Sequence, residues 1–126
     1  MKDERPDLTV RTKRYSLDVI KLFVSLPNNE VGKVLGRQML RSATSVGAHY
    51  REANRGKSLP DFISKIEGAL QELDETSYWL DLLSESGIDQ STELQRLCAE
   101  TDELIAIFVT IAKSAKHRKK GSLARN

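Results

Sequence analysis

Two long stretches of this chain place an apolar or small residue alternately four and three positions apart. The first series is Phe62, Ile66, Ala69, Leu73, Thr76, Leu80 and Leu83. The second is Leu94, Cys98, Thr101, Ile105, Phe108, Ala112 and Ala115, widened by Leu97, Leu104 and Ile111. Because a helix has about 3.6 residues per turn, this spacing brings each series to one helical face. Both stretches therefore predict amphipathic helices that pack against other helices.

Helix-breaking sequences interrupt the chain at three places, and three breaks imply four helices. The breaks are Pro27-Asn28-Asn29, Gly56-Lys57-Ser58 and Ser86-Gly87-Ile88-Asp89. Ser58 predicts an N-cap for the third helix, and Gly56 and Gly87 suit the position that follows a helix end. Valine and isoleucine do not alternate with polar residues over any strand-length window. The sequence thus predicts an all-α fold, an antiparallel up-and-down four-helix bundle with short connections.

The first helical segment, Tyr15 to Leu26, is apolar on most of its sides. One side carries Leu17, Ile20, Phe23 and Val24, and another carries Val19, Leu22 and Leu26. We therefore expect more than one neighbouring helix to cover it. A chain of 126 residues has the size of one domain. We expect a single bundle domain over residues 1–126, with frayed ends at about 1–11 and 117–126.

Cys98 is the only cysteine, so the chain cannot form an internal disulfide. It lies within the apolar series of the fourth helix. We interpret it as a small buried apolar residue. The chain contains no apolar run of membrane-spanning length, and its N-terminus is charged where a signal peptide is apolar. The expected location is therefore the cytoplasm, without contact with a membrane.

Motifs of catalysis and cofactor binding are absent from the sequence: there is no P-loop, GxGxxG, CxxC or HExxH. The two histidines, His49 and His117, have no neighbours at metal-ligand spacing, and the single His49/Glu52 pair is a weak signal. We expect no catalytic residues, no metal and no cofactor, and hence a protein that is not an enzyme.

Charge is strongly segregated along the chain, although the total is only +2. Residues 1–57 contain 12 Lys and Arg against 6 Asp and Glu. Residues 58–103 contain 2 against 12, and residues 104–126 contain 6 against none. Such segregation usually produces faces of opposite sign, which pair within a subunit, pair between subunits or attract an external polyanion.

The second predicted helix carries five cations on one side, within an arc of about 80° at 100° per residue. We call them the basic stripe: Lys33, Arg37, Arg41, Arg51 and Arg55. One interpretation is a solvated face, or a face that forms ion pairs with carboxylates of the third helix. The other is a surface that binds phosphates, because arginine donates forked hydrogen bonds to phosphate oxygens. The terminal segment KSAKHRKK would suit the same purpose.

The same helix accepts residues that disfavour a helix interior. Gly47 costs about 1 kcal/mol relative to alanine, and the hydroxyls of Ser42 and Ser45 can bond to nearby backbone. We expect Ala43 and Gly47 to form a notch into which a neighbouring helix or a large ring packs closely. Ser42 and Ser45 are interpreted as a polar flank of the helix.

Three large side chains fall outside the apolar series of the third helix: Tyr78, Trp79 and Leu82. Exposed apolar patches commonly mark interaction surfaces. We favour burial of this cluster between subunits of a homo-oligomer over a platform on which bases stack.

The segment from Leu35 to Leu83 resembles the four-helix-bundle proteins encoded in intervening sequences of bacterial 23S ribosomal RNA genes. The most specific parts are LRSATSVGAHYREA and DFISKIEGALQELDETSYWL. The resemblance extends more loosely from about Tyr15 to Lys116, and His49 stands where the family usually has asparagine. It implies a helical bundle that in some members forms a ring, with a largely undefined molecular function. The fold is also similar to the accessory variability proteins of diversity-generating retroelements, which form pentameric basic barrels that bind a reverse transcriptase and nucleic acid.

These observations lead to two expectations. The first is a non-enzymatic homo-oligomer, a ring such as a pentamer, which binds RNA or DNA backbone without sequence preference. In it the basic stripe contacts phosphates, and Tyr78, Trp79 and Leu82 hold subunits together. The alternative is a protein-interaction scaffold or an accessory subunit, for example of a reverse transcriptase, with no direct role in binding nucleic acid.

Overall fold

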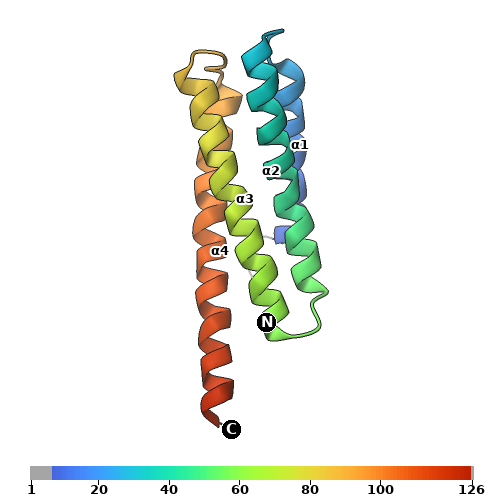
Figure 1. Cartoon of the computed structure of the whole chain (residues 1–126), viewed down its shortest axis with the longest axis vertical. Coiled ribbons are helices and arrows are strands. Elements are labelled where there is room, and N and C mark those ends of the chain that lie inside the picture. The colour runs from blue at the N-terminus through green and yellow to red at the C-terminus, as the bar shows by residue number, and fades with distance from the viewer. Residues whose placement is uncertain (1–6, 126) are drawn as a thin grey trace.

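The computed structural model describes residues 7–125, and it consists of four helices that run alternately up and down (Figure 1). They are α1 (Leu8–Ser25), α2 (Glu30–Asn54), α3 (Leu59–Glu85) and α4 (Thr92–Arg125). Consecutive helices pack side by side, and a narrower contact between α1 and α4 closes the bundle. The prediction of an all-α antiparallel four-helix bundle is confirmed.

The helix ends follow from local side chains, as the sequence predicted. Ser58 caps α3 by accepting a hydrogen bond from the backbone N–H of Asp61 (3.2 Å). Asn29 caps α2 in the same way, accepting from the N–H of Gly32 (2.9 Å). Gly87 follows Ser86, the C-cap residue of α3. Its φ is +79°, a conformation that glycine adopts without a steric cost.

The two apolar series form the core of the bundle. From α3, all members are buried except Phe62, which is half-buried. From α4, Cys98, Ile105 and Ile111 are half-buried, and the other members are buried. Cys98 packs against the core as expected, and burial raises the pKa of its thiol. The periodicity of the sequence therefore identified the inner faces of both helices.

Each helix also contributes one hydroxyl to a buried polar layer, which consists of Tyr15, Ser42, Thr76 and Thr101. Ser42 Oγ lies 2.7 Å from Thr76 Oγ1, and Tyr15 Oη lies 2.6 Å from Thr101 Oγ1. Thr76 and Thr101 also bond to the backbone carbonyls of Glu72 and Leu97, four residues earlier. The interpretation of Ser42 as a polar flank is therefore wrong, because its side chain is buried and bonded across the bundle. Ser45 is half-buried and bonds to the Arg41 carbonyl, as a flanking residue does.

α1 is shorter than the other helices and borders only the upper part of the bundle in Figure 1. It contacts α2 and α4, as expected for a helix with more than one neighbour. Its third side is not covered, however: Leu17 is 49% exposed, Ile20 40% and Val24 76%. Two neighbouring helices thus cover α1, and one apolar side of it remains exposed in the single chain.

The ends of the chain are more helical than the sequence indicated. α1 begins at Leu8, within the segment expected to fray, and α4 continues to Arg125. Residues 1–6 and 126, which belong to the same expectation, lie outside the described residues. The last turns of α4 extend beyond the α2–α3 connection, at the lower end of Figure 1. The C-terminal part of α4 carries Lys113, Lys116, Arg118, Lys119 and Lys120, so this end of the helix is basic.

Candidate nucleic-acid interface

The five residues of the basic stripe are all exposed: four lie on α2, and Arg55 is the C-cap residue that follows it. Four of them form no ion pair with a carboxylate among the described residues: Lys33, Arg37, Arg51 and Arg55. The half-buried Thr44 and the exposed Ala48 lie between them, so no bulky side chain separates the upper from the lower cations. The stripe is thus accessible along the length of the helix.

Arg41 differs from the other members because it is bonded to α3. Its guanidinium donates to Glu75 (2.7 Å) and lies 3.4 Å from Glu72. The Arg41 side chain is 55% exposed, and ion pairs at such sites contribute about 0–1 kcal/mol. The ion-pair interpretation therefore holds for Arg41, which has to exchange a carboxylate for a phosphate before it can bind nucleic acid.

The notch at Gly47 receives a neighbouring helix, as the sequence predicted. A Cβ atom at this position would lie 3.3 Å from Thr12 Oγ1 and 3.5 Å from Thr12 Cβ of α1. Gly36, higher on the same side of α2, accommodates Phe23 and Leu26 of α1, and a Cβ there would lie 2.6 Å from Leu26 Cδ1. Small residues thus allow α1 to lie close to α2, on a side of α2 that does not carry the basic stripe.

The three residues predicted to form a subunit contact differ in their exposure. Tyr78 is 57% exposed, whereas Trp79 and Leu82 are half-buried and Trp79 packs against the core. The indole Nε1 of Trp79 is buried without a hydrogen-bond partner. The rings of Tyr78 and Trp79 pack edge to face, with their centroids 5.2 Å apart. Tyr78 is therefore the member that is best placed to contact another molecule.

Two exposed valines of α2, toward the α3–α4 connection, are further apolar surface residues that were not predicted from the sequence. Val34 is 51% exposed and Val31 56% exposed. Val34 lies seven residues before Arg41 and therefore on the same side of α2, the side that contacts α3. Because Ser42 pairs with Thr76 across antiparallel helices, Val34 is level with the turn of α3 that contains Leu82. The position of these valines relative to α3 follows only from the register of α2 against α3, which the sequence alone does not give.

The exposed side of α3 around Tyr78 is acidic. Its outward residues recur at helical spacing and include the exposed carboxylates Glu67, Asp74, Asp81 and Glu85. Only Glu67 forms an ion pair among the described residues, with Lys116 of α4 (2.8 Å). The bundle therefore presents a basic surface on α2 and an acidic surface on α3, as the charge segregation of the sequence predicted.

Within residues 7–125, no group of three or more His, Cys, Asp and Glu side chains is arranged to hold a metal ion. No helix over the same residues combines the length and the apolar character that crossing a membrane requires.

Comparisons with known proteins identify the family. The model of the 23S rRNA-intervening sequence protein family matches residues 7–110. A solved structure from Bacteroides thetaiotaomicron VPI-5482, described as a protein of unknown function from the S23 ribosomal protein family, is 31% identical. Its superposition has a TM-score of 0.79 and covers 85% of this chain and 99% of that chain. Comparison with curated proteins gave no match. The chain therefore belongs to the 23S rRNA-intervening sequence protein family.

Proposed function

We propose that this bundle binds the phosphate backbone of nucleic acid, without sequence preference and without catalysis, through the basic stripe of α2. The observation that carries the proposal is the exposure of Lys33, Arg37, Arg51 and Arg55 along one helix side, with no carboxylate partner among the described residues. A row of this kind gains affinity from the release of counterions that are condensed on a polyanion. Contacts with phosphates carry no sequence information directly, so binding of this kind has no sequence preference.

We further propose that the functional unit is a homo-oligomer, in which the exposed side chains of Tyr78 on α3 and Val34 on α2 are covered by other subunits. Both side chains are more than half exposed, and an apolar surface of this kind is often an interaction site. A contact between unlike faces of successive subunits closes into a ring, and a pentamer is one such assembly. Several copies of the stripe on one particle would also strengthen binding to a long polyanion.

The test of the proposal is binding of a fluorescently labelled ribosomal RNA fragment, followed by anisotropy. Arg51→Glu should weaken binding strongly, because it places a negative charge within the stripe. Arg96→Glu is the matched control, since Arg96 is exposed on α4 outside the stripe and its replacement changes the net charge equally. Equal effects of the two substitutions would show that only the total charge matters, and would contradict a role for the stripe.

A second candidate function is a protein-interaction scaffold, for example an accessory subunit of a reverse transcriptase. The observation that favours it is the acidic surface of α3, where Asp74 and Asp81 lie on either side of the exposed Tyr78. This surface repels nucleic acid and suits a basic protein partner. The two functions differ in their response to salt, because an apolar protein interface is weakened much less than a set of phosphate contacts.

A further inference from the structure

One side of α1 carries a row of apolar side chains that no other described helix covers. We call this row the outer stripe of α1, and it consists of Val10, Leu17, Ile20 and Val24, which are between 40% and 76% exposed. Successive members are seven, three and four residues apart, so they lie along one side of the helix, over about 20 Å at 1.5 Å per residue. A continuous apolar surface of this kind is typical of an interaction site.

The outer stripe lies away from the sides by which α1 contacts the bundle. Thr12 faces Gly47 of α2, and Arg11 bonds to Glu100 of α4 at 2.7 and 2.8 Å. At 100° per residue, Leu17 lies about 140° around the helix from Thr12 and about 120° from Arg11. A partner that covers the outer stripe therefore does not displace α1 from its place in the bundle.

Cations border the outer stripe. Lys13, Arg14 and Lys21 are exposed, and none of them forms an ion pair with a carboxylate among the described residues. Asp18 is the only carboxylate of α1, against four Lys and Arg. Basic residues around an apolar row suit a partner surface that combines an apolar side chain with carboxylates.

The outer side of α3 around Tyr78 is such a surface. The exposed Tyr78 has Asp74 four residues before it, Asp81 three residues after it and Glu85 one turn further along. None of these three carboxylates forms an ion pair among the described residues. The surface thus offers one large apolar ring among uncompensated negative charges.

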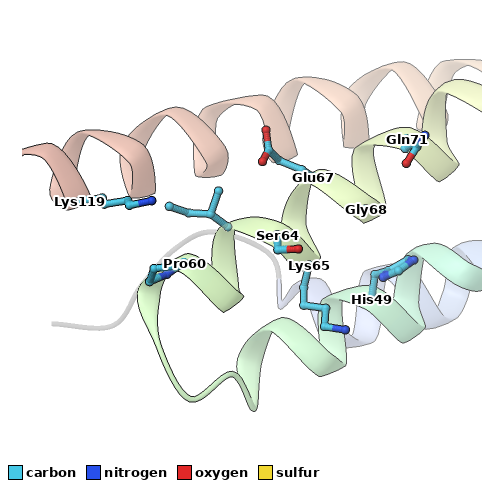
Figure 2. A pocket seen from close by; sticks show the side chains of 9 residues that line it. His49, Pro60, Ser64, Lys65, Glu67, Gly68, Gln71 and Lys119 are labelled. Carbon is cyan, nitrogen blue, oxygen red and sulfur yellow. The ribbon is translucent and has the colours of Figure 1, made fainter.

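The N-terminal half of the same side of α3 is less suited to a basic partner. Its carboxylate, Glu67, points toward α4 in Figure 2 and is bonded to Lys116 (2.8 Å). Ser64 and Gln71, the other outward residues of this half, are uncharged. The unpaired carboxylates of this side of α3 are therefore concentrated around Tyr78.

The two surfaces match in the spacing of their charges. On α1, Arg14 and Lys21 are seven residues apart, with Leu17 between them. On α3, the carboxylates on either side of Tyr78 are also seven residues apart. Seven residues are about 10 Å along a helix. Two helices that pack lengthwise with Leu17 against Tyr78 therefore place a cation near a carboxylate on both sides of the apolar contact.

We propose that the outer stripe of α1 binds the α3 surface around Tyr78 of a second copy of this chain. The inference rests on the homo-oligomer proposed above, and it names the surface that covers Tyr78. The two surfaces do not meet within one chain, because α1 contacts α2 and α4. Each subunit thus supplies one surface of each kind, and a contact between unlike faces continues from subunit to subunit until the assembly closes.

Charge favours this pairing over a pairing of like surfaces. Two outer stripes placed together would bring the cations of α1 close to one another, and two α3 surfaces would do the same with carboxylates. Contact between the outer stripe and the α3 surface instead covers apolar side chains on both partners and compensates the charges around them.

The test is the particle mass in light scattering of Leu17→Asp, of Tyr78→Asp and of their equimolar mixture. Each variant alone should have the monomer mass, because it lacks one of the two surfaces. The mixture should contain particles of the dimer mass, since the intact α1 of one variant binds the intact α3 surface of the other. Leu17→Asp at the parent mass, or a mixture that remains monomeric, would overturn the proposal.

Charge reversal at exposed positions provides a second test that does not alter an apolar side chain. Arg14→Glu/Lys21→Glu should have the monomer mass, and Asp74→Lys/Asp81→Lys added to the same chain should restore the oligomer. Failure of this restoration would contradict the pairing. Ala106→Asp, on an exposed position of α4, is the control for added negative charge and should keep the parent mass. Circular dichroism verifies that each variant remains helical.

The outcomes separate this inference from the homo-oligomer on which it rests. Dissociation of Tyr78→Asp together with an unchanged mass of Leu17→Asp would overturn the contact with α1 alone, and another surface would then cover Tyr78. A parent protein that is monomeric at every concentration would overturn both. RNA binding through the basic stripe is measured separately by anisotropy and is not decided by either result.

Discussion

Ser42 Oγ and Thr76 Oγ1 lie 2.7 Å apart at the centre of the bundle, where each is fully buried. Each hydroxyl also has a backbone carbonyl within reach on its own helix, that of Glu72 for Thr76 (2.8 Å) and that of Met39 for Ser42 (3.2 Å). Burial of both residues is favourable only in the register that brings them together, because an unpartnered hydroxyl in the core is costly. The pair therefore fixes how α2 and α3 are aligned, and with this the position of the basic stripe relative to the acidic side of α3.

Removal of one partner of this pair should destabilise the fold. Thr76→Val leaves Ser42 with only its longer contact to the Met39 carbonyl (3.2 Å), and the free energy of unfolding should fall by about 1–2 kcal/mol. The double variant Ser42→Ala/Thr76→Val should lose less than the sum of the single variants, because neither hydroxyl is left alone. Denaturant unfolding followed by circular dichroism measures both. Ser45→Ala on the same helix serves as control, and strict additivity would contradict the proposed pairing.

Substitution at the α1–α2 notch should be costly as well. Gly47→Leu forces a side chain against Thr12, whose Oγ1 already lies 3.3 Å from the position of a Cβ atom, and the melting temperature should decrease. Gly121→Leu is the comparison, because a Cβ atom at Gly121 meets nothing within 4 Å and leucine favours a helix. If Gly47→Leu were neutral, the close approach of the helices would not explain the glycine.

The buried hydroxyl of Tyr15 should make the stability depend on pH in the alkaline range. Burial raises its pKa above the ordinary value of 10.0, so the folded state retains the proton that the unfolded state releases. This contribution is complete below pH 10 and is lost above it, at about 1.4 kcal/mol per pH unit. Tyr15→Phe loses the hydrogen bond to Thr101 (2.6 Å) and should therefore be less stable than the parent at neutral pH, and this gap should narrow above pH 10. Parallel stability curves would contradict this assignment.

The subunit contact is best tested at Tyr78. Trp79 packs against the core, so Trp79→Asp would damage the fold together with any interface. Tyr78→Asp changes a side chain that is 57% exposed and should shift the particle toward the monomer mass in light scattering. Gln71→Asp, two turns earlier on the same exposed side, is the matched control. A parent protein that is already monomeric, or an unchanged oligomer mass in Tyr78→Asp, would exclude this residue from an interface.

The sequence was sufficient for those features that depend on one helix at a time. The spacing from Phe62 to Leu83 gave the inner face of α3, since helical periodicity alone determines which residues share a side. Ser58 and Gly87 predicted the two ends of α3, because capping depends only on atoms that are close in the sequence. The basic stripe also follows from periodicity, and its exposure agrees with the structure.

Features that depend on two helices required the register between them. Periodicity placed Ser42 at the edge of the inner face of α2, but only the alignment with α3 brings Thr76 to it. The same alignment joins Arg41 to Glu75 and places His49 against Gly68. The exposure of Val24 on α1 has a different origin: the sequence predicted more than one neighbouring helix, and α2 and α4 are those neighbours, but neither covers the side of Val24.

The central claim is that the exposed cations of α2 contact phosphates, and the most direct measurement is the salt dependence of RNA affinity. We would measure the association constant by anisotropy at several salt concentrations for the parent protein and for Arg37→Gln/Arg51→Gln. Each phosphate contact contributes about 0.7–0.9 to the slope of log affinity against log salt. The account predicts a steep slope for the parent and a slope that is shallower by about 1.4–1.8 for the variant. Equal slopes in the two proteins, or no RNA binding by the parent at low salt, would contradict it.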